Sequence, residues 1–281
     1  MMAVFFPRRS GRIVLNLVVM PALALVLLFP IIWMLIVSFQ TEAETYRSPL
    51  VWWPSQIDLR NYLRMWEALD FQTYFVNTAI VAGATTILAI LVSGPAGYAL
   101  TRYRFRGAET FGTFLLATQM FPRVVLIVPY FVLMRNLGLV NTYPALILIY
   151  VSFAVPFCVW MLRGHFLAIP TDLDEAALVD GCGPFATFWR IVLPLSMPGI
   201  VATAMFAFLV GWNEFLFALV LTTDQKMSVI TLGLASLIGE YRTQWNELMA
   251  ATVVSSIPAI VLYAILERFL VAGMTAGATK G

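Results

Sequence analysis

The sequence has few charged residues and almost no histidine or cysteine. Of its 281 residues, 11% are charged and 61% are hydrophobic, whereas soluble globular domains carry about 25% charged and about 45–50% apolar residues. Such a chain cannot cover a water-facing surface, but it can cover a lipid-facing one. His165 is the single histidine, and the two cysteines, Cys158 and Cys182, fall in an apolar segment and a polar loop. This pattern excludes a Cys/His metal motif and makes a disulfide unexpected.

Motifs for nucleotide binding and for catalysis are also missing. The chain contains no G-x-x-x-x-G-K-[ST] phosphate-binding loop, and the glycines of residues 277–281 do not fit that pattern. No nucleophile–base arrangement stands out, which argues against a membrane-embedded enzyme. The net charge is +2, with no long basic run and no acidic tail. We therefore expect no metal, no catalytic residue and no nucleic acid partner.

Long apolar runs make up most of the chain. A bilayer-spanning helix needs roughly 20 mostly apolar residues, and the runs lack the alternation of β-barrel strands of about ten residues. The first run is also longer than the apolar core of a signal peptide, which has about 7–15 residues. We predict an all-α integral membrane protein with a single transmembrane domain over residues 1–281 and about six spans. The predicted spans are 13–39, 74–100, 108–134, 144–162, 197–221 and 248–270.

The predicted orientation follows from the distribution of arginine and lysine. One side carries more of these residues than the other, in short segments next to the spans, including the N-terminal and post-span-two clusters Arg8, Arg9, Arg12, Arg102, Arg104 and Arg106. Such segments stay in the cytoplasm, so both termini are predicted to be cytoplasmic. Two sizeable outer loops result, 40–72 and 222–247, together with one long inner loop, 163–196.

The inner loop reads as two short helices joined at a glycine. Thr171 is a candidate N-cap, with Asp174 in the capping-box position, and Gly181 suits the left-handed position after a helix. A second helix is predicted to begin at Pro184 and to end at Pro194, with an apolar side formed by Phe185, Phe188, Trp189 and Val192. The spacing alone also fits an amphipathic helix pair that lies on the membrane surface.

One motif in this loop resembles a known family. The EAA motif of ABC importer permeases reads EAA, three residues, G, nine residues, I, one residue, LP. The chain matches every fixed position, with Glu175, Ala176, Ala177, Gly181, Ile191, Leu193 and Pro194. In that family the loop docks into a cleft on the ATPase subunit. The resemblance implies this coupling role for these residues and for Asp180, and it makes residues 163–196 the coupling loop of the permease.

Further segments are similar to the smaller permease subunit of maltose-type importers. They are residues 119–122, residues 212–215 and the C-terminal tail. The resemblance implies that the tail, with Thr275, Gly277, Lys280 and Gly281, reaches the ATPases. It also implies a prokaryotic cytoplasmic (inner) membrane location, a second permease subunit, an ATPase dimer that holds ATP and Mg, and an extracytoplasmic sugar-binding protein. The outer loop 222–247 corresponds to one that inserts into that binding protein.

Three of the polar residues in the predicted spans are candidates for a functional role. Arg123 is in the third span, where an unpaired charge costs at least about 2.5–3.5 kcal/mol. We expect it to face a partner helix or an aqueous cavity, with backbone irregularity near Pro122 and Pro129 supplying acceptors. Asn213 and Glu214 lie in the outer half of the fifth span. They fit either a gate in the substrate pathway or structural hydrogen bonds to a neighbouring helix.

The combined expectation is a permease subunit that forms half of an ATP-driven pore for a sugar or oligosaccharide. A sugar-related solute, such as a glycerol phosphate ester, is an alternative cargo. A secondary transporter that acts alone is the alternative mechanism, and it would need coupling-ion sites near mid-membrane. Glu214 is the one carboxylate in the predicted spans that could serve such a site.

Overall fold

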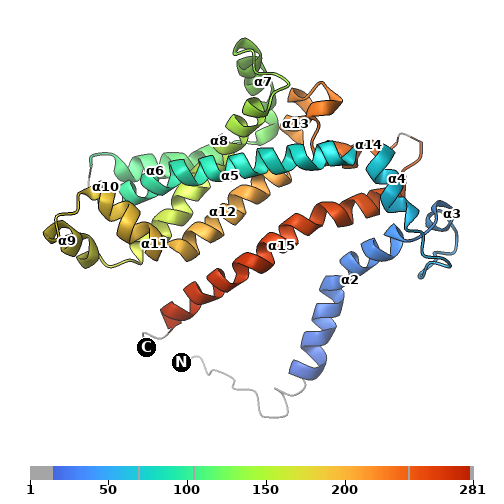
Figure 1. The fold of residues 1–281 in the computed structure, drawn as a ribbon, viewed down its shortest axis with the longest axis horizontal. Coiled ribbons are helices and arrows are strands. Elements are labelled where there is room, and N and C mark those ends of the chain that lie inside the picture. Colours follow the sequence, from blue (N-terminus) through green and yellow to red (C-terminus); the bar gives the residue numbers. More distant parts are fainter. Residues whose placement is uncertain (1–14, 69, 104, 240, 279–281) are drawn as a thin grey trace. The chain divides into compact units, whose positions relative to one another are not determined.

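The computed structural model describes residues 15–68, 70–103, 105–239 and 241–278 (Figure 1). In these ranges the regular structure is helical, apart from one isolated bridge between Ile238 and Thr243. The α-helices are α2 (Met20–Ser38), α3 (Glu42–Thr45), α4 (Arg60–Ala68), α5 (Phe71–Arg102), α6 (Ala108–Ala117), α7 (Ile127–Asn136), α8 (Tyr143–Leu167), α9 (Asp172–Val179), α10 (Pro184–Thr187), α11 (Leu193–Leu195), α12 (Met197–Trp212), α13 (Leu216–Leu221), α14 (Ile230–Ser236) and α15 (Trp245–Ala278). The predicted all-α class is confirmed.

Among the described residues, four helices are long and apolar enough to cross a membrane by themselves. They are Leu17–Ser38, Phe71–Arg102, Tyr143–Leu167 and Trp245–Glu267. Two bent pairs raise the number to as many as six, namely Ala108–Met120 with Arg123–Asn136, and Pro184–Leu195 with Met197–Trp212. The prediction of about six spans therefore agrees with the structure at its upper limit.

The third and fifth predicted spans are not straight helices. The third bends by 92° between Met120 and Arg123, because Pro122 lacks a backbone N–H and disfavours helix in the residue before it. The fifth was predicted to run to residue 221, but α12 ends at Trp212 and α13 begins only at Leu216. The first break agrees with the backbone irregularity predicted near Pro122, whereas the continuous apolar stretch gave no sign of the second.

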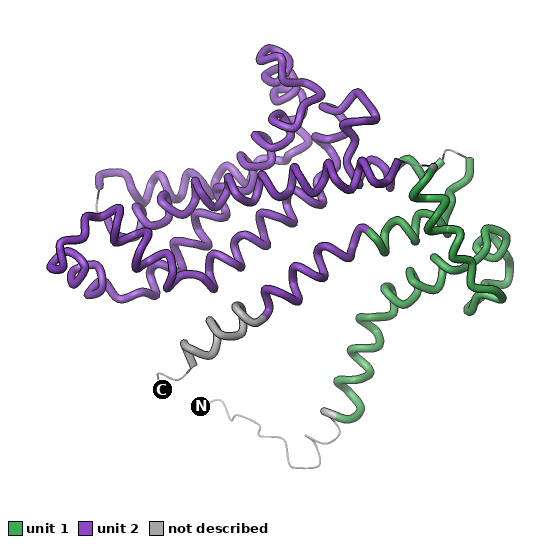
Figure 2. Tube along the Cα trace, in the orientation of Figure 1, with its two compact units in different colours: residues 1–69, 236–254 green, residues 70–235, 255–281 purple. Residues whose placement is uncertain are grey.

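The chain divides into two compact units, coloured in Figure 2. Unit 1 contains residues 1–69 and 236–254, and unit 2 contains residues 70–235 and 255–281. The single transmembrane domain predicted for residues 1–281 concerns the whole chain in the membrane. The division into two units does not test it, so it stays a prediction.

Unit 2 is built on three packed helices, α5, α8 and α12. Glycines allow their backbones to approach closely. A Cβ atom at Gly97 of α5 would lie 3.1 Å from the Val159 carbonyl oxygen of α8, and one at Gly211 of α12 would lie 2.9 Å from the Ala82 Cα of α5. Small residues at such contacts are typical of helix packing in membranes. At one end of these helices a buried cluster forms around Ile149, Tyr150, Phe153, Phe217 and Leu221.

In unit 1, α4 joins the segment after α2 to the first turn of α15. The Asn61 side-chain amide donates to the carbonyl oxygens of Ser38 and Gln40, each at 2.9 Å, and Asn246 donates to Asn61 Oδ1 at 2.8 Å. Asn61 and Asn246 are almost fully buried. Because buried polar groups are costly unless paired, these bonds hold the first predicted outer loop in one conformation, as expected for an ordered loop.

Glu44 closes that same loop. Its carboxylate accepts hydrogen bonds from the Ser55 hydroxyl and backbone N–H, at 2.5 and 2.8 Å, and from the Thr41 backbone N–H at 2.9 Å. The Ser55 hydroxyl and then the Thr41 and Ser55 amides stabilise the charged form, which lowers the pKa of Glu44 to about 2.

Candidate functional site

The loop between α8 and α12 contains the two predicted helices. α9 ends at Val179, and Gly181 follows with a φ of 82°. The Cys182 N–H donates to the Ala177 carbonyl at 2.8 Å, and the Gly181 N–H to that of Leu178 at 3.1 Å. This is the left-handed helix end that glycine permits, so the prediction for Gly181 is confirmed.

The second helix of the loop, the second arm, is less regular than predicted. It begins at Pro184 as expected and continues through a π-helical turn at Phe188–Val192 into α11. It ends at Leu195, one residue after the predicted end at Pro194. Of the predicted apolar side, Phe188 and Val192 are buried, whereas Phe185 and Trp189 are exposed.

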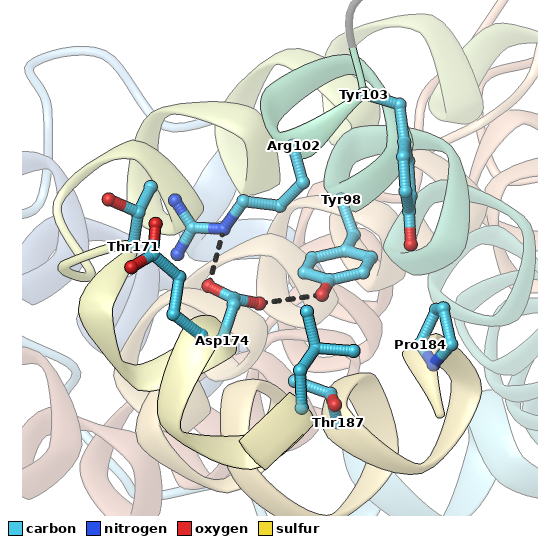
Figure 3. Close-up of a pocket in the computed structure, with 9 residues that line it drawn as sticks. Tyr98, Arg102, Tyr103, Thr171, Asp174, Pro184 and Thr187 are labelled. Carbon is cyan, nitrogen blue, oxygen red and sulfur yellow. Dashed lines mark hydrogen bonds and ion pairs between the residues drawn. The ribbon is translucent and has the colours of Figure 1, made fainter. Parts of the chain in front are cut away.

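The predicted capping box is wrong. Thr171 has helical backbone angles and makes no side-chain cap hydrogen bond. Asp174 instead points away from α9 toward the end of α5 (Figure 3). Its Oδ1 accepts from the Tyr98 hydroxyl at 2.7 Å, and its Oδ2 lies 2.9 Å from Arg102 Nε in an ion pair. The sequence spacing fits both arrangements, but a charged partner outweighs a local cap.

Arg102 and Tyr98 make further contacts that fix this junction. Arg102 Nη2 donates to the Ile169 carbonyl at 2.9 Å, and its side chain is only 9% exposed. The Tyr98 ring lies 5.1 Å from that of Phe188 and 6.1 Å from that of Phe166. The end of α5 thus contacts both arms of the loop and the end of α8, through a charge pair in a partly apolar setting.

A cavity of about 280 Å³ lies at this junction. Figure 3 shows Tyr98, Arg102 and Tyr103 on one side of it and Asp174 with Thr187 on the other. Glu175 and Leu178 also line it. The EAA motif therefore borders both the fixed junction and the surface of the loop.

The outward side of the loop is apolar and exposed. Val179 is 89% exposed, Phe185 75% and Leu178 57%, whereas Ala177 is buried. Glu175, Ala176, Asp180 and Gly181 are also exposed, Ile191 and Leu193 are half-buried, and Pro194 is exposed. Leu193 packs against the buried cluster that includes Phe166 and Val192. The motif thus has an inner part that packs and an outer part that is free for contact.

The first boundary predicted for the loop is wrong. α8 continues to Leu167, so residues 163–167 are helical and the loop proper begins at Ala168. Arg163 lies over the Trp160 ring at 5.1 Å and 3.9 Å from the Glu109 carboxylate of α6. Long side chains at a helix end place their charge beside such partners at low cost.

Arg123 sits at the break in the third predicted span. It begins the 3-10 turn after Pro122, is exposed, and lies 5.0 Å from the Phe153 ring centroid of α8. The expected irregular backbone and partner helix are both present, and the contact is a cation–π interaction.

Asn213 and Glu214 occupy the break between α12 and α13. Asn213 is exposed and donates to Leu209 of its own helix. Glu214 is buried and accepts from the backbone N–H groups of Phe217, at 3.1 and 3.2 Å, and Ala218, at 3.2 Å. These are structural bonds, as in one of the two predicted alternatives. The Glu214 backbone carbonyl also accepts a hydrogen bond from the Thr231 hydroxyl of α14 at 2.7 Å. Because Phe217 lies 5.2 Å from Phe153, the two breaks meet on one aromatic cluster.

The structure describes only part of the C-terminal tail. Thr275 and Gly277 lie in the last turns of α15, where the backbone is helical. Lys280 and Gly281 lie outside the described residues.

Sequence reasoning did not identify Tyr98 or Arg102 as important. A signal existed, because positions 98 and 102 are four apart and share one helix face. Nothing local marked their partner, since Tyr98 and Asp174 are 76 residues apart.

These features define a class: an α-helical, multi-span membrane protein. Its exposed pair of short helices, residues 172–195, is called the elbow and is held firmly on the ends of α5 and α8. A family model described as "Binding-protein-dependent transport system inner membrane component" matches residues 89–276. The chain belongs to this family of inner membrane transport components.

Curated relatives cover nearly the whole chain. The trehalose/maltose transport system permease protein MalG of Thermococcus litoralis is 38% identical over 92% of this chain and 94% of its own length. The sulfoquinovosyl glycerol transport system permease protein SmoH of Agrobacterium fabrum is 37% identical over 90% and 89%. The predicted resemblance to sugar permeases is confirmed.

A solved structure has the same fold. It is a chain of a bacterial ABC transporter involved in the import of the acidic polysaccharide alginate. The TM-score is 0.78 with 26% identity, and the match covers 94% of this chain and 98% of that chain.

Proposed function

We propose that this chain forms half of the translocation pore of an ATP-driven importer for a sugar or oligosaccharide. The observation that carries the proposal is the elbow at residues 172–195, which exposes Leu178, Val179 and Phe185 while Asp174 is fixed to α5. An exposed apolar surface on a firmly held element is the arrangement expected of a docking site for another protein.

The partner at this surface is an ATPase subunit, as the EAA motif implies. ATP and Mg²⁺ bind to that subunit, because this chain carries no phosphate-binding loop. A second permease completes the pore and a sugar-binding protein delivers the cargo. The elbow, the tail and both termini face the cytoplasm in this arrangement, in agreement with the arginine-rich segments.

Alternating access gives the mechanism. The ATPases bind the elbow in two positions, open and closed. Because a partner can shift a conformational equilibrium only through its differential affinity for the two states, the elbow must be bound more favourably in the ATP-closed state. Its displacement opens the pore outward, and hydrolysis returns it.

The cargo class rests on the relatives. Their names specify trehalose or maltose in one case and sulfoquinovosyl glycerol in another, and all of these carry several hydroxyl groups. The outer loop 222–247 is the expected contact with the binding protein.

Reconstitution in proteoliposomes tests the proposal. The chain, its partner permease, the ATPase and the binding protein are assembled together, and uptake of radiolabelled maltose, trehalose and a mixture of short oligosaccharides is measured with and without ATP. We expect ATP-dependent uptake that needs all four components. Uptake by this chain alone under an ion gradient would instead establish a secondary transporter and overturn the proposal.

A further inference from the structure

α5 has buried polar contacts at both of its ends with segments distant in the sequence. The helix has 32 residues and is therefore about 48 Å long at 1.5 Å per residue. Its end at Arg102 holds the elbow, as described above. Its end at Phe71 lies against the segment 225–233, which includes the start of α14 (Figure 1).

Asn77 and Thr78 make the contacts at the second end. The Asn77 side-chain amide donates to the carbonyl oxygens of Lys226, at 2.9 Å, and Ser228, at 2.7 Å. Thr78 Oγ1 accepts from the Ile230 N–H at 2.8 Å. Asn77 is 3% exposed and Thr78 is 1% exposed, so these bonds cannot be exchanged for water without cost.

The remaining capacity of Asn77 is used by α8. The Tyr143 hydroxyl donates to Asn77 Oδ1 at 2.6 Å. Every polar atom of the Asn77 side chain is therefore bonded, and such fully paired buried groups specify a single arrangement. In addition, Gly233 lies so close to the Tyr74 ring that a Cβ atom there would be 2.5 Å from it.

Between its two ends α5 is held along its length. It packs against α8 and α12, with the close backbone contacts at Gly97 and Gly211. Tightly packed helices move as units and not by continuous deformation. A displacement at one end of α5 is thus carried to the other end.

From these contacts we propose that α5 transmits the displacement of the elbow to the segment 225–233. Tyr98, Arg102 and Asp174 are positioning residues that attach α9 to α5. Asn77 and Thr78 are positioning residues that attach the segment 225–233 to the opposite end. The inference rests on the proposed function, in which the elbow binds the ATPase and the loop 222–247 contacts the binding protein.

The functional consequence is a communication route inside one subunit. The binding protein at the loop alters the position of α5, and α5 alters the position of α9 on the ATPase. Linkage is reciprocal, so ATP binding must also change the environment of residues 225–233.

The test uses the complete reconstituted complex and two measurements. The first is the ratio of ATPase activity with the binding protein to activity without it. The second is amide hydrogen exchange in residues 225–233 before and after addition of a non-hydrolysable ATP analogue. The variants are Asn77→Leu and Asp174→Asn, together with the milder Asn77→Asp and Tyr98→Phe. Thr86→Val is the matched control, because Thr86 lies on α5 but donates only within that helix, to Ala82.

We expect Asn77→Leu and Asp174→Asn to lower the stimulation ratio about tenfold, within the usual range of coupling between sites, while basal ATPase activity and the yield of assembled complex stay near wild type. The exchange response of residues 225–233 to nucleotide should disappear in both variants, and Thr86→Val should retain it. Asn77→Asp and Tyr98→Phe should give smaller losses.

Two results would overturn the inference alone. One is a wild-type stimulation ratio in Asn77→Leu and Asp174→Asn, and the other is a nucleotide response of residues 225–233 that persists in them. Absence of ATPase binding or of ATP-dependent uptake in the wild-type complex would overturn the proposed function, and the inference with it.

Discussion

The ring of His165 lies directly against Gly199, so that a Cβ atom added at position 199 would be 2.2 Å from the imidazole Cγ atom. His165 belongs to the last turn of α8 and Gly199 to the first turn of α12. The contact therefore sets how closely these two helices approach where the elbow joins them. It assigns the single histidine of the chain a packing role.

Gly199→Ala should destabilise the protein, because the added methyl group overlaps the ring. Overpacking of this kind costs about 1–3 kcal/mol, measured as a lower free energy of unfolding of the purified protein in detergent. Gly164→Ala is the control, since a Cβ atom there meets nothing within 4 Å. Equal stability of the two variants would contradict the contact.

Charge and backbone conformation in the EAA motif should both matter for ATPase docking. Glu175→Lys reverses an exposed charge, and Gly181→Asp forces a side chain into a left-handed conformation at a φ of 82°. Each should weaken ATPase binding about tenfold, equivalent to about 1.4 kcal/mol, while membrane insertion is retained. Binding is measured by titrating the purified ATPase onto the permease pair.

Glu109→Lys is the control for that experiment. It makes the same charge reversal at a site that is 94% exposed and outside the elbow. Normal sugar uptake and normal ATPase binding in the Glu175 and Gly181 variants would disprove the coupling role of the motif.

Glu214→Ala should destabilise the break between α12 and α13. It leaves the buried backbone N–H groups of Phe217 and Ala218 without their acceptor, at a cost of about 1–3 kcal/mol. Asn213→Ala is the adjacent control, because Asn213 is exposed and bonds only within its own helix. Thermal unfolding in detergent compares the two, and a larger loss in Asn213→Ala would refute this assignment.

The loop closed by Glu44 should lose stability in acid. The pKa of Glu44 is lowered to about 2 in the folded protein, so its stabilising contribution is complete above the unfolded pKa, near 4.5. That contribution is lost progressively as pH falls from there toward 2. Limited proteolysis of residues 40–58 between pH 5 and pH 3 is a suitable measurement, with an acid-active protease. Glu44→Gln should be cleaved readily at pH 5, whereas Glu67→Gln, at an exposed site, should behave as wild type.

Some features were predictable because their causes are local. Composition and run length identify helices for lipid, and the glycine at position 181 marks the end of α9. The EAA spacing identifies the elbow from the sequence alone. A fixed pattern of residue types within about twenty positions can be recognised without tertiary information. The extent of α8 was less predictable, since the charged Arg163, where the loop was predicted to begin, continues the helix.

Other features depend on partners that are distant in sequence. Asp174 looked like part of a capping box, but Arg102 and Tyr98 lie within its reach in the fold and hold it more strongly. Glu214 offered two roles, and only the fold shows that the break after Trp212 places its carboxylate against the backbone amides of α13. In each case the side chain had several local options of similar energy.

The amino-acid sequence by itself determined a multi-span helical membrane protein with a two-helix loop between α8 and α12, because hydrophobicity and helix-end chemistry act over one or two turns. The tertiary structure alone decided that α5 contacts both the elbow and the segment 225–233. Those contacts depend on which buried polar groups meet when α5, α8 and α12 pack together, and no local pattern encodes such a meeting.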